Sequence, residues 1–280
     1  TEDHLGLTNQ GATCYLNSIL QVLFHLKKFR KLIYDERVEQ NESNFIFCLQ
    51  LLFRDLQLRA SRRSTRHLTD SLGWNKDEVH TSQDASEFFK FLFESIFKGH
   101  SIVSLFEGEF NATVTNYLSD IPRYSKEKFI QILLKVEGFG SLIDSLKSFF
   151  FPFSFMDNQG MNGSIESIKQ ISIFKLPPVL SFVLKRFWFN EGTQQYEKLN
   201  SIMTFPNILN LNEVGIQTHD SNYQLYAIIA HIGTLNAGHY VSFINPDLKG
   251  TWYEFNDNKV FRQTAETTFN LCYGRNRMNA

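Results

Sequence analysis

Gly6-Leu7-Thr8-Asn9-Gln10-Gly11-Ala12-Thr13-Cys14-Tyr15-Leu16-Asn17-Ser18 joins a polar, glycine-containing loop to the start of an amphipathic helix. Thr13 is placed to cap this helix, so Cys14 lies in its first turn. Unpaired backbone N–H groups and the positive end of the helix dipole favour thiolate over thiol at that position. Cys14 is therefore a candidate nucleophile. The apolar residues that follow have the spacing of one helical face: Leu16, Ile19, Leu20, Leu23 and Phe24.

Two segments near the end of the chain supply the partners that a nucleophilic cysteine needs. Gly238-His239-Tyr240 opens an apolar run, 241–244, that predicts a strand. Trp252-Tyr253-Glu254-Phe255 predicts a second strand, which ends at the turn signal Asn256-Asp257-Asn258. Neighbouring strands would bring His239 close to Asn256. A cysteine, a histidine and an Asn or Asp from distant parts of a chain are what thiol acyl transfer requires.

Ordered motifs along the chain resemble those of the ubiquitin-specific proteases, over roughly residues 5–274. The Cys14 segment resembles their cysteine box, and residues 222–242 resemble their histidine box. Ser71-Leu72-Gly73-Trp74 resembles the herpesvirus-associated ubiquitin-specific protease and its relatives. Further blocks occur in the family's order: Gln83 to Phe88, Leu176 to Leu180, Leu184 to Phe187, and Phe205-Pro206 followed by Leu209 and Leu211.

The resemblance implies a deubiquitinating cysteine protease, which hydrolyses thioester, peptide or isopeptide bonds after the C-terminal glycine of ubiquitin. Cys14 is then the nucleophile, and His239 is the general base and acid. The family pattern places the residue that orients the imidazole at Asn256, with Asp257 as the alternative orienting residue or a supporting acid. It also places the oxyanion-stabilising amide at Asn9, where the backbone N–H of Cys14 is a second donor.

The resemblance further implies contacts for the C-terminal tail of ubiquitin. Gln83, Asp84 and Glu87 belong to the block with which the family grips this tail, whose arginines bind carboxylates. Tyr240 is expected to line the channel for the terminal Gly-Gly. A structural role is the alternative for one of the acids, because residues Thr81 to Asp84 fit a capping box at a helix start.

Loops in the second half of the chain match those that cover the bound tail in the family: residues 189–201 and 233–237. Gln10 is expected to assist Asn9 at the oxyanion. Relatives of the herpesvirus-associated type can rest with a misaligned triad that ubiquitin binding corrects. The resemblance then implies a separation of Cys14 from His239 too long for a hydrogen bond in the unliganded protein.

Composition excludes several partners. The 280 residues carry a formal net charge of −1, so neither nucleic acid nor another polyanion is implied. Three widely spaced cysteines indicate reduced thiols in an intracellular protein, cytoplasmic or nuclear. Neither a signal peptide nor an apolar run of about 18 residues is present, which argues against a membrane. The chain begins at Thr1 rather than Met, as an excised catalytic domain would, and we expect a monomer.

The remaining cysteines and histidines are expected to have structural roles. Many family members bind zinc with two Cys-x-x-Cys pairs, but this sequence has none, so we expect no metal and no cofactor. Cys48 lies on an apolar helix stripe and is expected in the core, and no chemistry is assigned to Cys272. His231 ends an apolar strand and is expected to pack or hydrogen-bond there. Six histidines are expected to be solvated: His4, His25, His67, His80, His100 and His219.

Periodicity predicts the α+β class as a single catalytic domain. Two more amphipathic stripes, 45–56 and 85–96, make residues 1–97 a helical bundle, whereas residues 223–274 are mostly strand. Short apolar runs after Gly99 predict further strands at 106–114, 129–136 and 179–187, the last apolar on both faces like a central strand. The resemblance implies a papain-like protease with three portions: thumb 1–97, fingers and part of the palm 98–178, and palm 179–280.

Two alternatives from other classes remain. The first is a catalytically silent ubiquitin-binding module, which would need a broken triad or a blocked cleft. The intact set of residues argues against it. The second is a protease for another ubiquitin-like modifier, with the same chemistry and a different contact surface.

Overall fold

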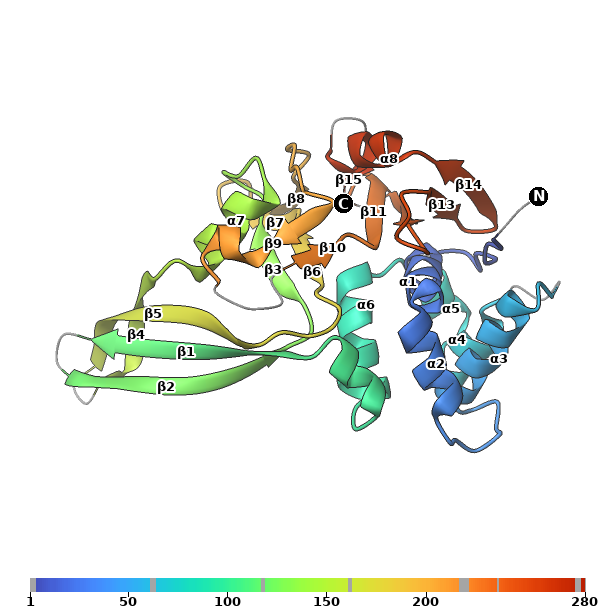
Figure 1. Ribbon diagram of the computed structural model, residues 1–280, viewed down its shortest axis with the longest axis horizontal. Helices are drawn as coiled ribbons and strands as arrows, with labels where there is room; N and C mark the ends of the chain where they lie inside the picture. Colours follow the sequence, from blue (N-terminus) through green and yellow to red (C-terminus); the bar gives the residue numbers. More distant parts are fainter. Residues whose placement is uncertain are drawn as a thin grey trace. The chain divides into compact units, whose positions relative to one another are not determined.

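Helices and sheets both contribute to the computed structural model, which describes residues 4–60, 64–116, 119–160, 163–216, 222–235, 237–274 and 278–279 (Figure 1). The expected α+β class is confirmed. The chain forms two compact units. Unit 1 comprises residues 1–102, 186–202 and 225–280, and unit 2 comprises residues 103–185 and 203–224. The division into thumb, fingers and palm stays a prediction.

The helices of unit 1 come first in the chain, and the three expected apolar stripes form three of them. The third stripe forms α6 and passes directly into a π-helical turn, Leu92–Ile96. A 3-10 turn follows at Ser101–Leu105. The α-helices are α1 (Cys14–His25), α2 (Lys27–Asp35), α3 (Phe45–Gln57), α4 (Arg66–Ser71), α5 (Lys76–Val79) and α6 (Ala85–Phe91).

Aromatic rings fill the core between these helices. The ring of Phe29 lies 5.7 to 6.4 Å, centroid to centroid, from those of Phe53, Phe93 and Phe97. All four side chains are buried to 2% exposure or less. Burying one such side chain contributes about 1.5–3 kcal/mol relative to leaving it exposed. The apolar stripes read from the sequence therefore face one another.

Helix α1 is buried on nearly every side, although its sequence is amphipathic. Its polar residues are buried together with the apolar stripe, so each needs a hydrogen-bond partner. Gln21 donates from Nε2 to the carbonyl of Leu5 (2.8 Å), and the ring of His25 bonds the carbonyl of Gln21 (2.9 Å). The helix that starts at Cys14 is thus a central element of unit 1.

The strands of unit 1 form a five-stranded antiparallel sheet in the order β14-β13-β12-β11-β15. Strand β12 pairs with β13 through Ser242 and Phe255, which confirms that these two strands are neighbours. A separate hairpin consists of β7 (Phe187–Asn190) and β8 (Gln195–Lys198). The sheet elements are β11 (Ala227–Gly233), β12 (Gly238–Ile244), β13 (Trp252–Asn256), β14 (Lys259–Gln263) and β15 (Met278–Asn279), with helix α8 (Ala265–Cys272) before the last strand.

Unit 2 contains a four-stranded antiparallel sheet in the order β2-β1-β5-β4, drawn as long neighbouring strands in Figure 1. Its strands are β1 (Gly108–Asn116), β2 (Ser119–Phe129), β4 (Phe153–Gly160) and β5 (Gly163–Lys175). The rest of the unit consists of β3 (Ile132–Lys135), β6 (Phe182–Lys185), α7 (Leu142–Phe150), β9 (Ile208–Asn210), a 3-10 turn (Leu211–Val214) and β10 (Asn222–Gln224).

The run 179–187 is not a central strand, contrary to expectation. Strand β6 covers only part of it, pairs in parallel with β3 in a two-stranded sheet, and is half-exposed. Arg186 then separates it from β7. Apolar residues on both faces come here from two short strands that belong to different small sheets. Run 129–136 is likewise divided, because β2 ends at Phe129 and β3 begins at Ile132.

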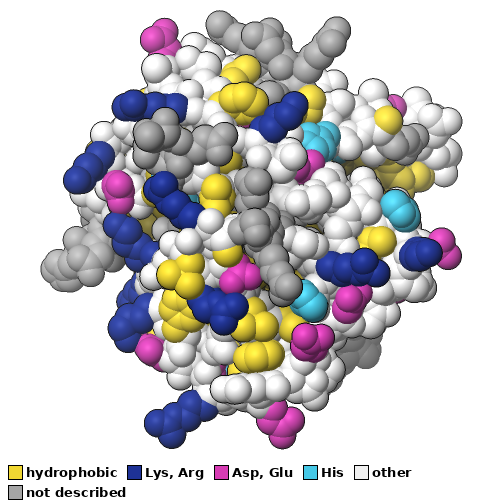
Figure 2. All heavy atoms as spheres, turned by 90° about the vertical axis from the view of Figure 1, so that its right-hand side faces the viewer, with side chains coloured by type: hydrophobic (Ala, Val, Ile, Leu, Met, Phe, Trp, Pro, Cys, Tyr) yellow, Lys and Arg dark blue, Asp and Glu magenta, His cyan; other side chains and the backbone are white. Residues whose placement is uncertain are grey.

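The surface carries both signs of charge. Figure 2 shows one face on which basic and acidic side chains are interspersed with hydrophobic and uncharged ones. Within the described ranges, no helix has the length and apolar character needed to cross a membrane. The described His, Cys, Asp and Glu side chains form no cluster of three or more that could hold a metal ion.

Candidate active site

Cys14 is the first residue of α1, and its side chain is buried. Thr13 occupies the N-cap position, and its carbonyl accepts the helical N–H of Asn17 (3.0 Å). The Thr13 hydroxyl, however, does not cap the helix as expected. It accepts the N–H of Gln10 (3.0 Å) and donates to Oδ1 of Asn9 (3.3 Å). The hydroxyl therefore stabilises the preceding loop instead of taking a free helical N–H.

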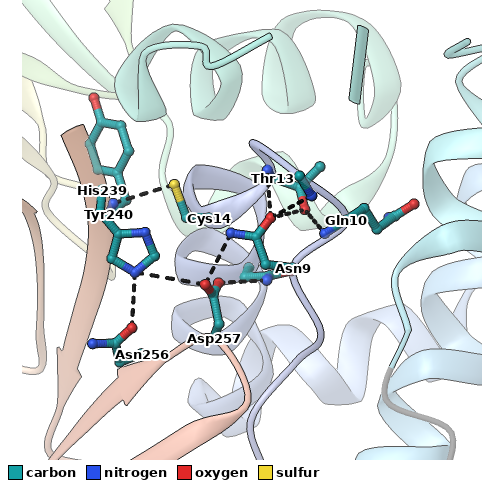
Figure 3. A network of polar contacts seen from close by, with 10 residues as sticks. Asn9, Gln10, Thr13, Cys14, His239, Tyr240, Asn256 and Asp257 are labelled. Carbon is teal, nitrogen blue, oxygen red and sulfur yellow. Dashed lines mark hydrogen bonds and ion pairs between the residues drawn. The ribbon is translucent and has the colours of Figure 1, made fainter. Parts of the chain in front are cut away.

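The thiol of Cys14 faces strand β12. The backbone N–H of Tyr240 points at Sγ of Cys14, with a nitrogen-to-sulfur distance of 3.4 Å (Figure 3). This donor comes from β12, so an element other than α1 directs a backbone N–H at the sulfur atom.

His239 lies between Cys14 and the end of β13. Its Nε2 is 2.9 Å from Oδ1 of Asn256 (Figure 3). An amide oxygen only accepts, so Nε2 carries a hydrogen and Nδ1 is left for the thiol. Interaction with the side chain of Cys14 raises the pKa of His239 to about 9, against the effect of burial and with further support from Asn256. The misaligned resting state that the resemblance implied stays a prediction.

Asp257 is the centre of a network that joins three segments. Its Oδ1 accepts from Nδ2 of Asn17 (2.9 Å), and its Oδ2 accepts from Nδ2 of Asn9 (3.0 Å). Its carbonyl accepts the N–H of Leu7 (2.8 Å). Oδ2 lies 3.7 Å from Nε2 of His239, the distance of an ion pair rather than a hydrogen bond. Asn256 therefore makes the direct contact with the imidazole, while Asp257 adds negative charge nearby.

Asn17 was missed by sequence reasoning. It follows Cys14 by three positions, which puts both residues on one helical face. A polar residue within an otherwise apolar helix was the signal available, since a buried amide needs a partner. Its partner, Asp257, is 240 positions away in the sequence. The pair could be suspected from α1 alone, but only the fold identifies the acid.

Asn9 lies in the loop before α1, with both ends of its amide engaged. Oδ1 accepts the N–H groups of Gly11 (2.9 Å) and Thr13 (3.1 Å). Nδ2 donates one hydrogen to Asp257, and an amide nitrogen has a second hydrogen to donate. These bonds fix the orientation of the Asn9 side chain beside the start of α1. Its proposed role at the oxyanion rests on that second N–H.

Gln10 does not face the thiol, contrary to the expected helper role. Its Nε2 donates to the hydroxyl of Thr65 (2.8 Å), and its Oε1 accepts from Thr69 (3.3 Å). Figure 3 shows this side chain directed away from Cys14. Thr65 is the N-cap of α4 and Thr69 lies within it, so Gln10 fixes the loop to that helix.

Asp84 is the N-cap of α6. Its Oδ1 accepts the N–H groups of Ser86 (2.7 Å) and Glu87 (3.2 Å), and its Oδ2 accepts from the hydroxyl of Tyr240 (3.3 Å). The expected capping box with Thr81 is therefore wrong, because the helix begins after Asp84. The Thr81 hydroxyl instead donates to the carbonyl of residue 77. Asp84, rather than Thr81 three residues earlier, is thus the residue that caps the helix.

The other expected tail-contact residues surround this cap. Gln83 is half-buried and Glu87 is exposed in the first turn of α6. Tyr240 is buried, and burial raises the pKa of its phenol above the usual range. The structure thus brings Asp84 and Tyr240 together and leaves Glu87 open to solvent.

His231 packs and hydrogen-bonds beside the site, as expected. Its ring lies 4.7 Å from the ring of Tyr240, centroid to centroid, and its Nδ1 lies 2.9 Å from Nζ of Lys198. Burial, and then the charge of Lys198, lowers the pKa of His231 to about 4. Between about pH 4 and about pH 9, His231 is therefore neutral whereas His239 is protonated.

Two cysteines and one histidine complete the comparison with expectation. Cys48 is buried, and its thiol donates to the carbonyl of Glu42 (3.2 Å), which confirms its place in the core. Cys272 is fully buried at the end of α8. His25 was expected to be solvated, which is wrong: burial lowers its pKa to about 3. The expectation for His219 falls outside the described residues.

The grouping of Cys14, His239 and Asn256 has the residue types that a thiol hydrolase requires. The family model described as ubiquitin carboxyl-terminal hydrolase matches residues 5–275. The chain therefore belongs to the ubiquitin carboxyl-terminal hydrolase family, whose members are cysteine-type deubiquitinases. The earlier resemblance to ubiquitin-specific proteases is confirmed at this level.

Curated relatives and a solved structure agree with this membership. The chain is 32% identical to ubiquitin carboxyl-terminal hydrolase 7 of Caenorhabditis briggsae, across 96% of this chain and 26% of the relative. It is 30% identical to ubiquitin carboxyl-terminal hydrolase 15 of Saccharomyces cerevisiae, across 98% and 24%. It thus spans about a quarter of the length of these relatives. A chain in the structure of the SAGA Ubp8/Sgf11/Sus1/Sgf73 DUB module bound to ubiquitin aldehyde matches with a TM-score of 0.81 and 25% identity, across 99% of this chain and 68% of that chain.

Proposed function

We propose that this chain hydrolyses the thioester, peptide or isopeptide bond after the C-terminal glycine of ubiquitin and so removes ubiquitin from conjugates. One observation carries the proposal. A buried thiol at a helix start, an imidazole on the residue before the N–H that points at this thiol, and an amide oxygen 2.9 Å from the Nε2 of that imidazole come together from three segments. The family and the solved relative supply the substrate class.

The reaction begins with proton transfer from the Cys14 thiol to Nδ1 of His239. The thiolate attacks the carbonyl carbon of the terminal glycine, and the carbonyl oxygen becomes an oxyanion. The imidazolium then gives its proton to the leaving amine, the C–N bond breaks and a thioester remains. His239 next takes a proton from water, whose oxygen attacks the thioester. Ubiquitin leaves as a carboxylate, and the thiol is restored.

Asn256 holds His239 in the tautomer that this sequence needs. By accepting from Nε2, it keeps Nδ1 as the proton acceptor for Cys14. Asp257 supports the imidazolium with its charge, since its Oδ2 is 3.7 Å from Nε2. Asn9 and the backbone N–H of Cys14 stabilise the oxyanion, which is worth about 2.7–4 kcal/mol for one such donor in a comparable site.

The tail of ubiquitin is proposed to bind beside the cap of α6. Asp84 keeps acceptor capacity beyond its two backbone bonds and Tyr240, because a carboxylate has about four lone-pair sites. Glu87 is exposed one turn along the helix, and Gln83 precedes the cap. These three side chains form an acidic and amide surface suited to the arginines of the tail, with Tyr240 beside the terminal Gly-Gly.

Finer assignments are also proposals. The motif Ser71-Leu72-Gly73-Trp74 favours the herpesvirus-associated subgroup, and Gly73 has the left-handed backbone (φ +74°) that suits glycine. The division into thumb, fingers and palm follows the family pattern. We propose ubiquitinated proteins as partners, a monomeric catalytic domain without nucleic-acid or membrane partners, and a cytoplasmic or nuclear location.

A ubiquitin probe with a C-terminal electrophile tests the proposal. Wild-type protein should form a covalent adduct with it, and Cys14→Ala should form none. Cys48→Ala is the matched control, because that thiol is equally buried but lies in α3. Absence of labelling on a folded wild-type protein would overturn the proposal.

The same labelling separates the two alternatives. A protein that binds ubiquitin without forming the adduct is the silent binding module. A protein labelled only by a probe built on another ubiquitin-like modifier is a protease for that modifier. The solved relative bound to ubiquitin aldehyde favours ubiquitin over both.

A further inference from the structure

Lys198, at the end of β8, makes three hydrogen bonds through one ammonium group. Its Nζ lies 2.9 Å from Nδ1 of His231, 2.9 Å from the carbonyl of His231 and 2.8 Å from the carbonyl of Gly233. A lysine ammonium has three N–H donors and no acceptor, so every hydrogen has a partner. We name Lys198, His231 and Gly233 the Lys198 cluster.

The Lys198 cluster connects the β7–β8 hairpin to the end of β11. Gly233 pairs with Gly238, and the adjacent register pair joins Ile232 to His239. The acceptors of Lys198 therefore lie on the strand that neighbours the catalytic histidine, directly before the turn into β12. Gly233 also needs its left-handed backbone (φ +96°), and an added Cβ there would lie 2.5 Å from the carbonyl of Ala237.

The ring of His231 extends the Lys198 cluster toward the thiol. Because Nδ1 accepts from Lys198, the ring hydrogen belongs on Nε2. The ring packs edge to face on Tyr240, and Nε2 lies so close to Gly238 that a Cβ there would be 2.0 Å away. Tyr240 in turn donates its N–H to Cys14 and its hydroxyl to Asp84. A continuous series of contacts thus runs from Lys198 to the nucleophile.

The charge of Lys198 has no carboxylate partner in the described part of the chain. Burial, and then the nearby Arg186, lowers the pKa of Lys198 to about 8. The charged groups that face His231 are Lys198 itself, Asp84 and His239. An unpaired, partly buried cation is unfavourable, and an apolar side chain of similar length would avoid the cost. In return, the ammonium donates to the three acceptors of His231 and Gly233 at the end of β11.

We propose that Lys198 is a positioning residue, which sets the end of the β11–β12 hairpin and, through His231, the ring of Tyr240 for the C-terminal tail of ubiquitin. This inference rests on the proposed function, because the tail is the group that the hairpin end receives. Lys198 touches neither the thiol nor His239. Its loss therefore affects how the tail binds and leaves the Cys14–His239 pair intact.

Lys198→Met is the variant that tests this role, since methionine retains length and removes all three donors. With ubiquitin C-terminal aminomethylcoumarin as substrate, we expect KM to rise about tenfold, the scale of a small misplacement, while kcat stays within about threefold. The rate of Cys14 alkylation by iodoacetamide should remain at the wild-type value. Lys249→Met is the matched control, because Lys249 is exposed in the turn between β12 and β13.

A second measurement does not depend on ubiquitin. Nitrogen-15 NMR of the histidine rings should show Nε2–H for His231 in wild type and a changed Nδ1 resonance in Lys198→Met. Failure of wild type to cleave the ubiquitin substrate would overturn the proposed function. The NMR result would then test only the contact between Lys198 and His231.

Two outcomes would overturn the positioning role. One is a fall in kcat and alkylation rate together at unchanged KM, which indicates a smaller folded fraction and thus a merely structural lysine. The other is an unchanged His231 resonance in Lys198→Met, which would remove the route to Tyr240. Increased KM with a changed resonance supports the role.

Discussion

Two histidines on neighbouring strands of one sheet have opposite electrostatic environments. His239, on β12, contacts a thiol and an amide oxygen, and its pKa is raised to about 9. His231, on β11, is buried beside an ammonium, and its pKa is lowered to about 4. His231 pairs with Tyr240 and His239 pairs with Ile232, so the two side chains lie on opposite faces of the sheet. The groups that face each ring decide which histidine moves protons and which one supports packing.

Replacing each histidine should give the largest contrast. His239→Ala removes the base and should lower kcat/KM for a ubiquitin substrate by about 10³-fold or more. His231→Phe keeps an aromatic ring on Tyr240 and should lower it by less than about 30-fold. Steady-state kinetics on both variants, with circular dichroism to confirm folding, checks this. Equal losses would contradict the assignment of roles.

Asp257→Ala breaks the hydrogen bonds that join Asp257 to the amides of Asn9 and Asn17. It leaves the amides of Asn9 and Asn17 without their acceptor, at a cost of about 1–3 kcal/mol for each buried group. We expect lower unfolding free energy in urea and a loss of activity that exceeds the fraction unfolded. Asp247→Ala is the control, since that carboxylate is exposed and ion-paired with the exposed Lys27. A stable Asp257→Ala protein would show that the network is dispensable.

Acid should destabilise the protein through His231. Its pKa is about 4 in the folded state against 6.5 for the free group, so the unfolded chain binds the proton first. The contribution of neutral His231 to stability is complete above pH 6.5 and is lost as pH falls toward 4. Each unit of difference corresponds to about 1.4 kcal/mol. The midpoint temperature of thermal unfolding should fall less steeply from pH 7 to 4 in His231→Phe than in wild type. Parallel curves for the two proteins would refute this.

The opposite sign applies to His239, whose folded-state pKa lies above 6.5. Its protonated form contributes stability that is complete below pH 6.5 and lost as pH rises through about 9. His239→Gln should therefore unfold with a weaker dependence on alkaline pH than wild type. Thermal melts from pH 6.5 to 9.5 measure the difference. An identical decrease of the midpoint temperature with pH in wild type and His239→Gln would contradict it.

Tyr240 lies between the two environments and should show the smallest effect. Tyr240→Phe removes the bond from its hydroxyl to Asp84 but keeps the ring against His231 and the N–H to Cys14. A net hydrogen bond of about 1 kcal/mol corresponds to a roughly fivefold change in KM for a ubiquitin substrate. A loss as large as that of His239→Ala would mean that the phenol takes part in the chemistry.

Much of the site could be predicted because its residues stand at local signals. Cys14 follows a loop and starts a helical stripe, His239 opens a strand, and Asn256 ends one. Helical period and turn residues depend on neighbours in the sequence, so they are visible without a fold. The helix stripes at 45–56 and 85–96 were predictable for the same reason.

Side-chain partners were less predictable because they depend on packing. The Thr13 hydroxyl bonds the loop instead of its helix, Asp84 replaces Thr81 as the cap, and His25 is buried rather than solvated. For Thr13 and Asp84 several hydrogen-bond partners compete locally, and differences of about 1 kcal/mol decide between them, whereas the burial of His25 depends on packing with distant residues. Such differences are too small to read from residue type.

The sequence by itself, through local signals and the family resemblance, indicated the proposed nucleophile, the proposed base and the residue proposed to orient it, together with the helical and strand-rich portions that carry them. Only the tertiary structure decided that Asp257 joins Asn9 and Asn17, 248 and 240 positions away, and that Lys198 binds the end of β11. The physical reason is range. Backbone periodicity is a local property, whereas a hydrogen bond between distant side chains forms only after burial has brought both groups out of water and left each in need of a partner.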